Sequence, residues 1–196
     1  MTRADLHHHL PSLRFVIAIV VTVLLLMAAF VWFGVYNIAA DAPHSRPAYV
    51  LLESLRDRSI AVHARGIRTP ADLEAPAHVA AGAGLYAEMC QGCHLGPGIE
   101  PTEMAQGLYP QAPELAKDTD LSPAQKFWII KHGVKLTAMP AWGKTHPDRL
   151  IWDMVAFLQK MPGMTPMQYR ATTASAPKDH DVVMKDATRS EANKRH

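Results

Sequence analysis

A run of 22 residues without a charged side chain, from Phe15 to Tyr36, constrains this chain more than any other feature. As an α-helix rising about 1.5 Å per residue, the run would be roughly 33 Å long, close to the hydrocarbon thickness of a bilayer. Thr22 supplies its only clearly polar side chain, whereas a soluble surface helix carries a polar stripe. The run therefore predicts a transmembrane anchor over residues 15–36.

A cleaved signal peptide is the competing interpretation, because Ala40-Asp41-Ala42 resembles a small-x-small cleavage site. The apolar core of a signal peptide is about 7–15 residues long, and this run is longer, which favours an uncleaved anchor.

Flanking charge does not orient the anchor. Arg3 and Arg14 precede it and Arg46 and Arg56 follow it, so the positive-inside rule is balanced.

Residues 37–78 are predicted to form a connecting helix and linker. Ser45 and Pro47 suit a helix start, and Gly66 suits a helix end. The helix could be a spacer or a docking surface for a partner subunit, and the spacer is the simpler interpretation. The whole chain has 20 basic and 18 acidic residues and a formal charge of +2, so no charge excess suggests nucleic-acid binding.

Residues 79–162 are predicted to form a compact all-α domain without strands. Ser122 is the expected N-cap of one helix, with Pro123 at its first position, Gln125 completing a capping box and Gly133 at its end. A long irregular loop is expected from Leu95 to Leu121. The three expected helices run from about Val79 to Met89, from Ser122 to Gly133, and from Pro147 to Pro162.

Residues 163–196 are predicted to be a disordered polar tail, because the chain beyond about Gln168 is polar, charged and poor in aromatic side chains. A metal site in the tail is the alternative to a solvated segment. Its candidate ligands are His180, Asp181, Met184 and His196.

The two cysteines of the chain, Cys90 and Cys93, lie three positions apart and are followed directly by His94. A structural zinc site usually needs a second such pair, and a thioredoxin-type dithiol follows a strand in a βαβ unit. A disulfide over so short a loop would restrict little chain entropy. Cys-x-x-Cys-His is the attachment signature of c-type haem, with the histidine as axial iron ligand. One covalently bound haem c is therefore expected.

Methionine sulfur fills the second axial position in electron-transfer cytochromes. Met139 lies between two expected helices, where Pro140 and Gly143 make a loop that can place a side chain over the haem. Met104, in the long loop, is the competitor. His94 and Met139 are the favoured pair of iron ligands.

The segments GAGLYAEMCQGCH, GVKLTAMPAWG and IWDMVAFLQKM together resemble a class I cytochrome c domain. The resemblance implies that Gly82 and Tyr86 of the first helix pack on Phe157 and Leu158 of the last. It also implies that the carbonyl of Pro113, in Pro113-Glu114-Leu115, accepts the proton of His94. The expected haem-pocket residues are Tyr86, Pro113, Leu115, Trp128, Pro140 and Trp142.

In this family, haem is attached outside the cytoplasmic membrane, so the resemblance implies a bacterial inner-membrane protein with a periplasmic haem domain and a cytoplasmic N-terminus over residues 1–14. The expected function is single-electron transfer, not catalysis. The donor would be a quinol-oxidising complex or a dehydrogenase, and the acceptor an oxidase or a reductase. A haem-bearing subunit of a larger respiratory complex is the alternative, followed by a peroxidase or ligand sensor. Lys131, Lys135 and Lys144 flank the Met139 loop and are candidates for partner docking.

Overall fold

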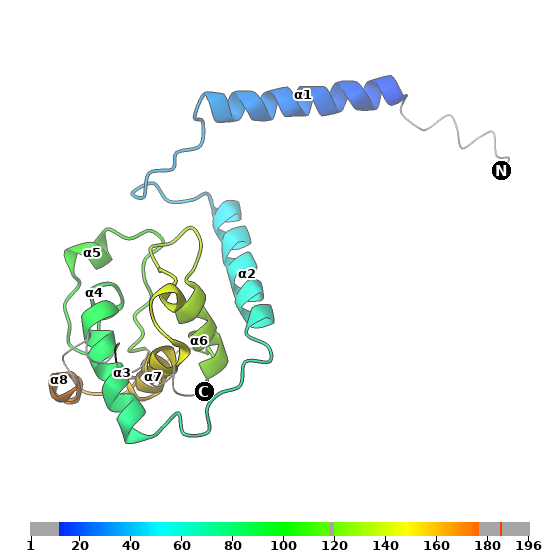
Figure 1. Cartoon of the computed structure of the whole chain (residues 1–196). Helices are drawn as coiled ribbons and strands as arrows, with labels where there is room; N and C mark the ends of the chain where they lie inside the picture. Colours follow the sequence, from blue (N-terminus) through cyan, green and yellow to red (C-terminus); the bar gives the residue numbers. More distant parts are fainter. Residues whose placement is uncertain (1–11, 118–119, 177–184, 186–196) are drawn as a thin grey trace. The chain divides into compact units, whose positions relative to one another are not determined.

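The computed structural model describes residues 12–117, 120–176 and 185, and it divides into two compact units at Ala42/Pro43. Figure 1 shows helices joined by loops along the whole described chain. None of the described residues lies in a β-strand. The all-α fold predicted from the sequence is therefore confirmed.

The N-terminal unit contains one long helix, α1 (Leu13–Trp32), of 20 residues. Ser12 caps its N-terminus by accepting a hydrogen bond from the Phe15 amide, and the chain leaves the helix at Phe33 and Gly34. The helix is long and apolar enough to cross a membrane by length and composition. The predicted limits of 15–36 are shifted, because Gly34 adopts a positive φ of 59° and ends the helix.

Helix α2 (Arg46–His63) opens the second unit and confirms the predicted connecting helix. One face packs on α6 (Pro123–His132), where Ile60 is buried and the His63 ring lies 5.6 Å from that of Trp128. The other face is solvent-exposed and carries Leu51 and Leu55.

The core of the second unit is the crossing of α3 (Pro76–Met89) and α7 (Asp148–Lys160). Gly82 sits at the contact point, and a Cβ there would lie 1.9 Å from the Asp153 carbonyl oxygen. Only glycine permits so close an approach of two backbones. The rings of Tyr86 and Phe157 meet beside it at 5.4 Å, so the helix contact that the resemblance implies is confirmed.

Helix α6 has the ends that the sequence predicts. Ser122 and Gln125 form a capping box, proline occupies the first turn, and Gly133 closes the helix with φ 66°. Short helical segments connect the longer helices: α4 (Gln91–His94), α5 (Glu103–Gln106) and the 3-10 turn η2 (Trp142–Lys144). Helix α5 interrupts the loop that was predicted to be irregular.

The predicted disordered tail of residues 163–196 is wrong for its first part, which forms helix α8 (Pro166–Ser175). Its N-terminus has a capping box made by Thr165 and Gln168, and its Tyr169 is only 1% exposed. Polar composition suggested disorder, but a single large aromatic side chain packs this helix onto α3. Residues 177–184 and 186–196 lie outside the described residues, and all four candidate metal ligands of the tail, His180, Asp181, Met184 and His196, fall among them.

Candidate haem-binding site

Both cysteines lie in a tight turn at the end of α3. Cys90 follows the last residue of α3, and its carbonyl accepts hydrogen bonds from the amides of Cys93, at 3.1 Å, and His94, at 2.9 Å. Leu95, at φ 59°, then reverses the chain. One helical turn therefore presents two thiols and an imidazole together, and both thiols are free. We call residues 90–95 the attachment turn.

The His94 ring is oriented by the Pro113 carbonyl oxygen, which lies 2.8 Å from Nδ1. A carbonyl only accepts, so Nδ1 must donate and carry the proton, which leaves the lone pair of Nε2 for a metal. Burial lowers the pKa of His94, although the hydrogen bond to Pro113 raises it. The neutral imidazole, which is the form that binds iron, is thus favoured. The hydrogen bond implied by the family resemblance is confirmed.

The Cys90 thiol is half-buried, and burial, followed by the neighbouring Cys93, raises its pKa to about 12. Redox-active dithiols instead lower a thiol pKa, because the thiolate is the attacking species. The raised pKa of Cys90 therefore does not suit this thiol to act as the attacking group in thioredoxin-type exchange. Two free thiols beside a histidine with an available Nε2 fit covalent haem better than dithiol chemistry.

Two tyrosines hold the attachment turn from behind. The Tyr86 hydroxyl donates to the Leu95 carbonyl at 2.7 Å, and the Tyr169 hydroxyl donates to Gln91 Oε1 at 2.7 Å. Burial raises the pKa of both phenols, that of Tyr169 to about 12. Both hydroxyls therefore keep their protons and donate at neutral pH.

Tyr169 is the residue that sequence reasoning missed, because it falls within the predicted tail. The signal that could have found its helix was local. Thr165-Pro166-Met167-Gln168 repeats the pattern of Ser122-Pro123-Ala124-Gln125, with a capping residue, a proline and a glutamine.

The Met139 loop, residues 134–141, is fastened to the end of α6. The Val134 amide donates to the Met139 carbonyl at 3.2 Å. The Thr137 hydroxyl donates to the Val134 carbonyl at 2.8 Å and accepts from the Met139 amide at 3.1 Å. The close contact between the Met139 loop and the end of α6 also requires glycine at position 133, since a Cβ there would lie 2.7 Å from the Met139 carbonyl oxygen. The side chain of Met139 is half-buried against the hydrophobic core.

Met104, the competing iron ligand, lies in a different place. Its Sδ is 3.3 Å from Cys93 Sγ, and its side chain is 62% exposed. The structure thus places Met104 beside a cysteine of the attachment turn, whereas Met139 packs with the core.

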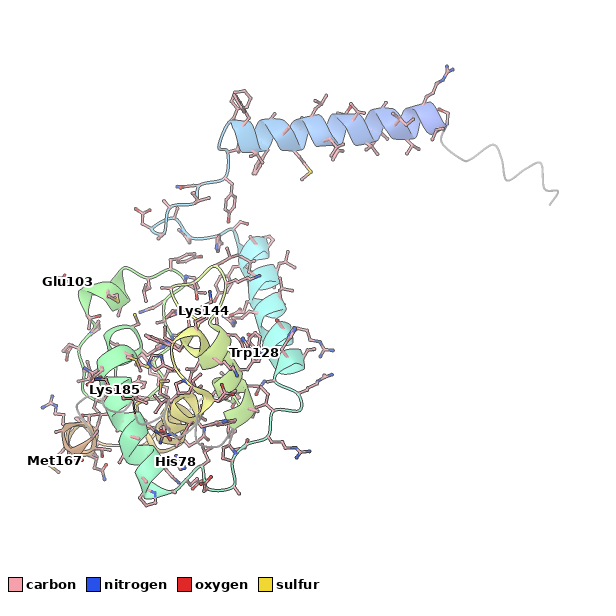
Figure 2. The ribbon with its side chains drawn as sticks, viewed as in Figure 1. His78, Glu103, Trp128, Lys144, Met167 and Lys185 are labelled. Atoms are coloured by element: carbon pink, nitrogen blue, oxygen red, sulfur yellow. The ribbon has the colours of Figure 1, made fainter. Side chains whose placement is uncertain are left out.

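The other predicted pocket residues fall into two groups. Tyr86, Leu115 and Trp142 belong to the same hydrophobic cluster as Met139 and Cys90. Pro140 is exposed, and the Trp128 ring contacts are to His63 of α2 and His132, at 5.6 and 5.1 Å. Figure 2 shows Trp128 on the side of α6 that faces α2. The structure brings Trp128 to the α2 contact.

The three candidate docking lysines differ in the structure. Lys131 forms an ion pair with Asp148 at 2.6 Å and lies over the Phe127 ring. Lys135 and Lys144 are exposed.

Residues of the described part of the chain form no cluster of three or more His, Cys, Asp or Glu that could hold a bare metal ion.

A comparison with protein-family models matches part of the second unit. Residues 77–158, less than half of the 196-residue chain, match the family model described as cytochrome c oxidase, cbb3-type, subunit III. Curated proteins and solved structures give no match. This region is a cytochrome c domain, which implies a haem cofactor. With the apolar helix α1, the match fits a membrane-anchored monohaem cytochrome c.

Proposed function

We propose that this protein carries single electrons as a membrane-anchored cytochrome with one covalent haem. The observation that carries the proposal is the attachment turn, in which two free thiols adjoin a histidine whose Nδ1 proton is held by the Pro113 carbonyl. Bound there, haem supplies a reversible one-electron couple of its iron.

Each site residue has a separate task in this proposal. Cys90 and Cys93 would hold the haem by thioether bonds, and His94 would bind the iron through Nε2. Pro113 keeps that imidazole oriented. Met139 would supply the sulfur ligand that completes the coordination of the iron, which would leave no position for a substrate and would favour electron transfer over catalysis.

The haem domain would work on the periplasmic side of a bacterial inner membrane, held there by α1. It would take electrons from a quinol-oxidising complex or a dehydrogenase and pass them to an oxidase or a reductase. Exposed Lys135 and Lys144 would steer an acidic partner, whereas the charge of Lys131 is already paired with Asp148. Lys135→Glu with Lys144→Glu should slow transfer at low salt only; salt-independent rates would contradict this.

A second candidate function is a haem-bearing subunit of a larger complex, favoured by the oxidase-subunit description of the matching family. Extraction of the full chain in mild detergent followed by sizing separates the two. A carrier elutes alone, whereas a subunit elutes with its complex.

The test of haem attachment is Cys90→Ser combined with Cys93→Ser in the full chain. Haem that survives denaturing electrophoresis should be lost completely, because no thiol remains to form a thioether. Met104→Ala, which changes the sulfur beside Cys93 but no thiol, is the matched control and should retain the stain. Retained stain in the double serine variant would refute covalent attachment.

A further inference from the structure

Helix α8 lies beyond the region that matches the cytochrome family, yet it contacts the attachment turn. Its Tyr169 is 1% exposed, and its hydroxyl donates to Gln91 Oε1 at 2.7 Å across 78 positions of sequence. The Tyr169 ring also lies against Gly96, where a Cβ would come within 2.6 Å of a ring carbon. Met167 of the same helix is 78% exposed and takes no part (Figure 2).

These contacts bracket the residues that would bind haem. Gln91 directly follows Cys90, and Gly96 comes two positions after His94. The Tyr169 side chain therefore contacts the chain at Gln91, before Cys93, and again at Gly96, after His94. Helix α8 also contacts Gly98. A Cβ at Gly98 would lie 2.6 Å from Pro166, and the Gly98 carbonyl accepts a hydrogen bond from Arg170 Nη2 at 3.5 Å.

The other side of the Tyr169 ring rests on the helix crossing. Its centroid lies 6.4 Å from that of Tyr86, edge to face, and 6.1 Å from that of Phe157. Tyr86 and Phe157 are both fully buried. The ring thus connects the attachment turn to the buried crossing of α3 and α7.

We propose that Tyr169 is a positioning residue, which fixes the attachment turn, and with it His94, through the hydrogen bond to Gln91 and the contact with Gly96. The inference rests on the proposed function. A held turn would keep the His94 imidazole in one orientation, and the orientation of that ligand would tune the reduction potential of the bound haem.

A purely structural cover makes a different prediction. If α8 only shielded apolar surface, changes at Tyr169 would lower the unfolding temperature and leave the potential of the folded protein unchanged. A positioning residue changes the potential of molecules that are still folded and still carry haem.

The experiment uses the full chain with haem bound and compares Tyr169→Phe, Gln91→Ala and the double variant. Tyr169→Phe keeps the ring and removes only the hydroxyl. Each single variant should shift the potential of the folded, haem-bearing protein, because the turn would hold His94 less firmly. The double variant should shift it no further, since both changes break one bond. Met167→Ala is the matched control on α8 and should shift nothing.

Amide hydrogen exchange gives a second measurement that does not depend on the redox state. Exchange at Cys93, His94 and Leu95, whose amides close the attachment turn, should accelerate about fivefold in Tyr169→Phe, the effect of losing one net hydrogen bond. An unchanged potential and unchanged exchange, or additive shifts in the double variant, would overturn the positioning role. A wild-type chain without covalent haem would instead refute the proposed function.

Discussion

The two sides of the haem site are held in different ways. The attachment turn is held by its own backbone bonds and also by groups from other elements: the side chains of Tyr86 on α3 and Tyr169 on α8, and the backbone carbonyl of Pro113. The Met139 loop is held by its own short-range bonds, through Val134 and Thr137. Its Leu136 is 77% exposed at a positive φ of 61°.

This difference predicts unequal mobility. Local opening costs least where few buried contacts must be broken, and the Met139 loop has the fewer of them. The His94 side should therefore stay fixed in both redox states, whereas the Met139 side should open more readily. A displaceable methionine would also be the property through which the ligand-sensor alternative could act.

Replacing Met139 should give the largest effect. Met139→Ala removes the proposed sulfur ligand, so the iron should gain an open position, its potential should fall, and the sulfur-to-iron charge-transfer absorption of the ferric state should vanish. Absorption spectroscopy and potentiometry measure all three. Met104→Ala is the control and should change none of them, and the reverse result would make Met104 the ligand.

A change at the helix crossing should weaken both sides together. Gly82→Ala places a Cβ against the Asp153 carbonyl, 1.9 Å away, so α3 and α7 must separate. Overpacking of this kind costs about 3 kcal/mol, measurable by denaturant unfolding. Gly107→Ala is the matched control, since its nearest atom would be 3.6 Å away. Equal stability of the two variants would contradict the crossing as the shared support.

A smaller change should open the Met139 side alone. Thr137→Val keeps the shape of the side chain and removes the two hydrogen bonds of its hydroxyl. At about 1 kcal/mol for each bond, the open state should become roughly 5–30-fold more populated. Carbon monoxide binding to the reduced protein measures the population of this open state.

The control for this variant is Thr172→Val on α8, because the Thr172 hydroxyl bonds only within its own helix. It should bind carbon monoxide as the wild type does. Equal binding by both threonine variants would mean that the Met139 loop is held by something other than Thr137.

A pH dependence is expected at an ion pair far from both sides of the haem site. His78 Nδ1 contacts the buried carboxylate of Asp153, and this hydrogen bond raises the pKa of His78. Burial raises the pKa of Asp153, against the lowering effect of His78. A raised histidine pKa contributes stability that is complete below the ordinary value of about 6.5 and is lost as pH rises through the folded value.

The unfolding temperature of the wild type should therefore fall as pH rises above 6.5, and His78→Ala should flatten that slope. His78→Ala should also cost about 1–3 kcal/mol in acid, because Asp153 would lose its hydrogen-bond partner. Two other charges face the pair. The Asp72 carboxylate lies 3.4 Å from His78 Nε2, and Arg149 lies 3.8 Å from the Asp153 carboxylate. Asp72→Asn should reduce the slope less than His78→Ala, and an unchanged slope in His78→Ala would refute the role of this pair.

The features that the sequence could predict depend on residues a few positions apart. The Cys90–His94 motif, the capping box of Ser122 and Gln125, and the helix-ending Gly133 all act within one or two turns, and the structure has each of them in place. The length of the uncharged run likewise predicted α1 to within a few residues. Neighbours along the chain meet whatever the rest of the fold does, so their pattern suffices.

Tertiary structure decided which distant residues meet. Tyr169 finds Gln91 across 78 positions, and His78 finds Asp153 across 75. Trp128 turns to α2, and Lys131 pairs with Asp148. A tail that is polar in composition becomes an ordered helix because one aromatic ring is buried behind the attachment turn. The burial free energy of such a side chain exists only once the surface that receives it has formed, and no short segment of sequence contains that surface.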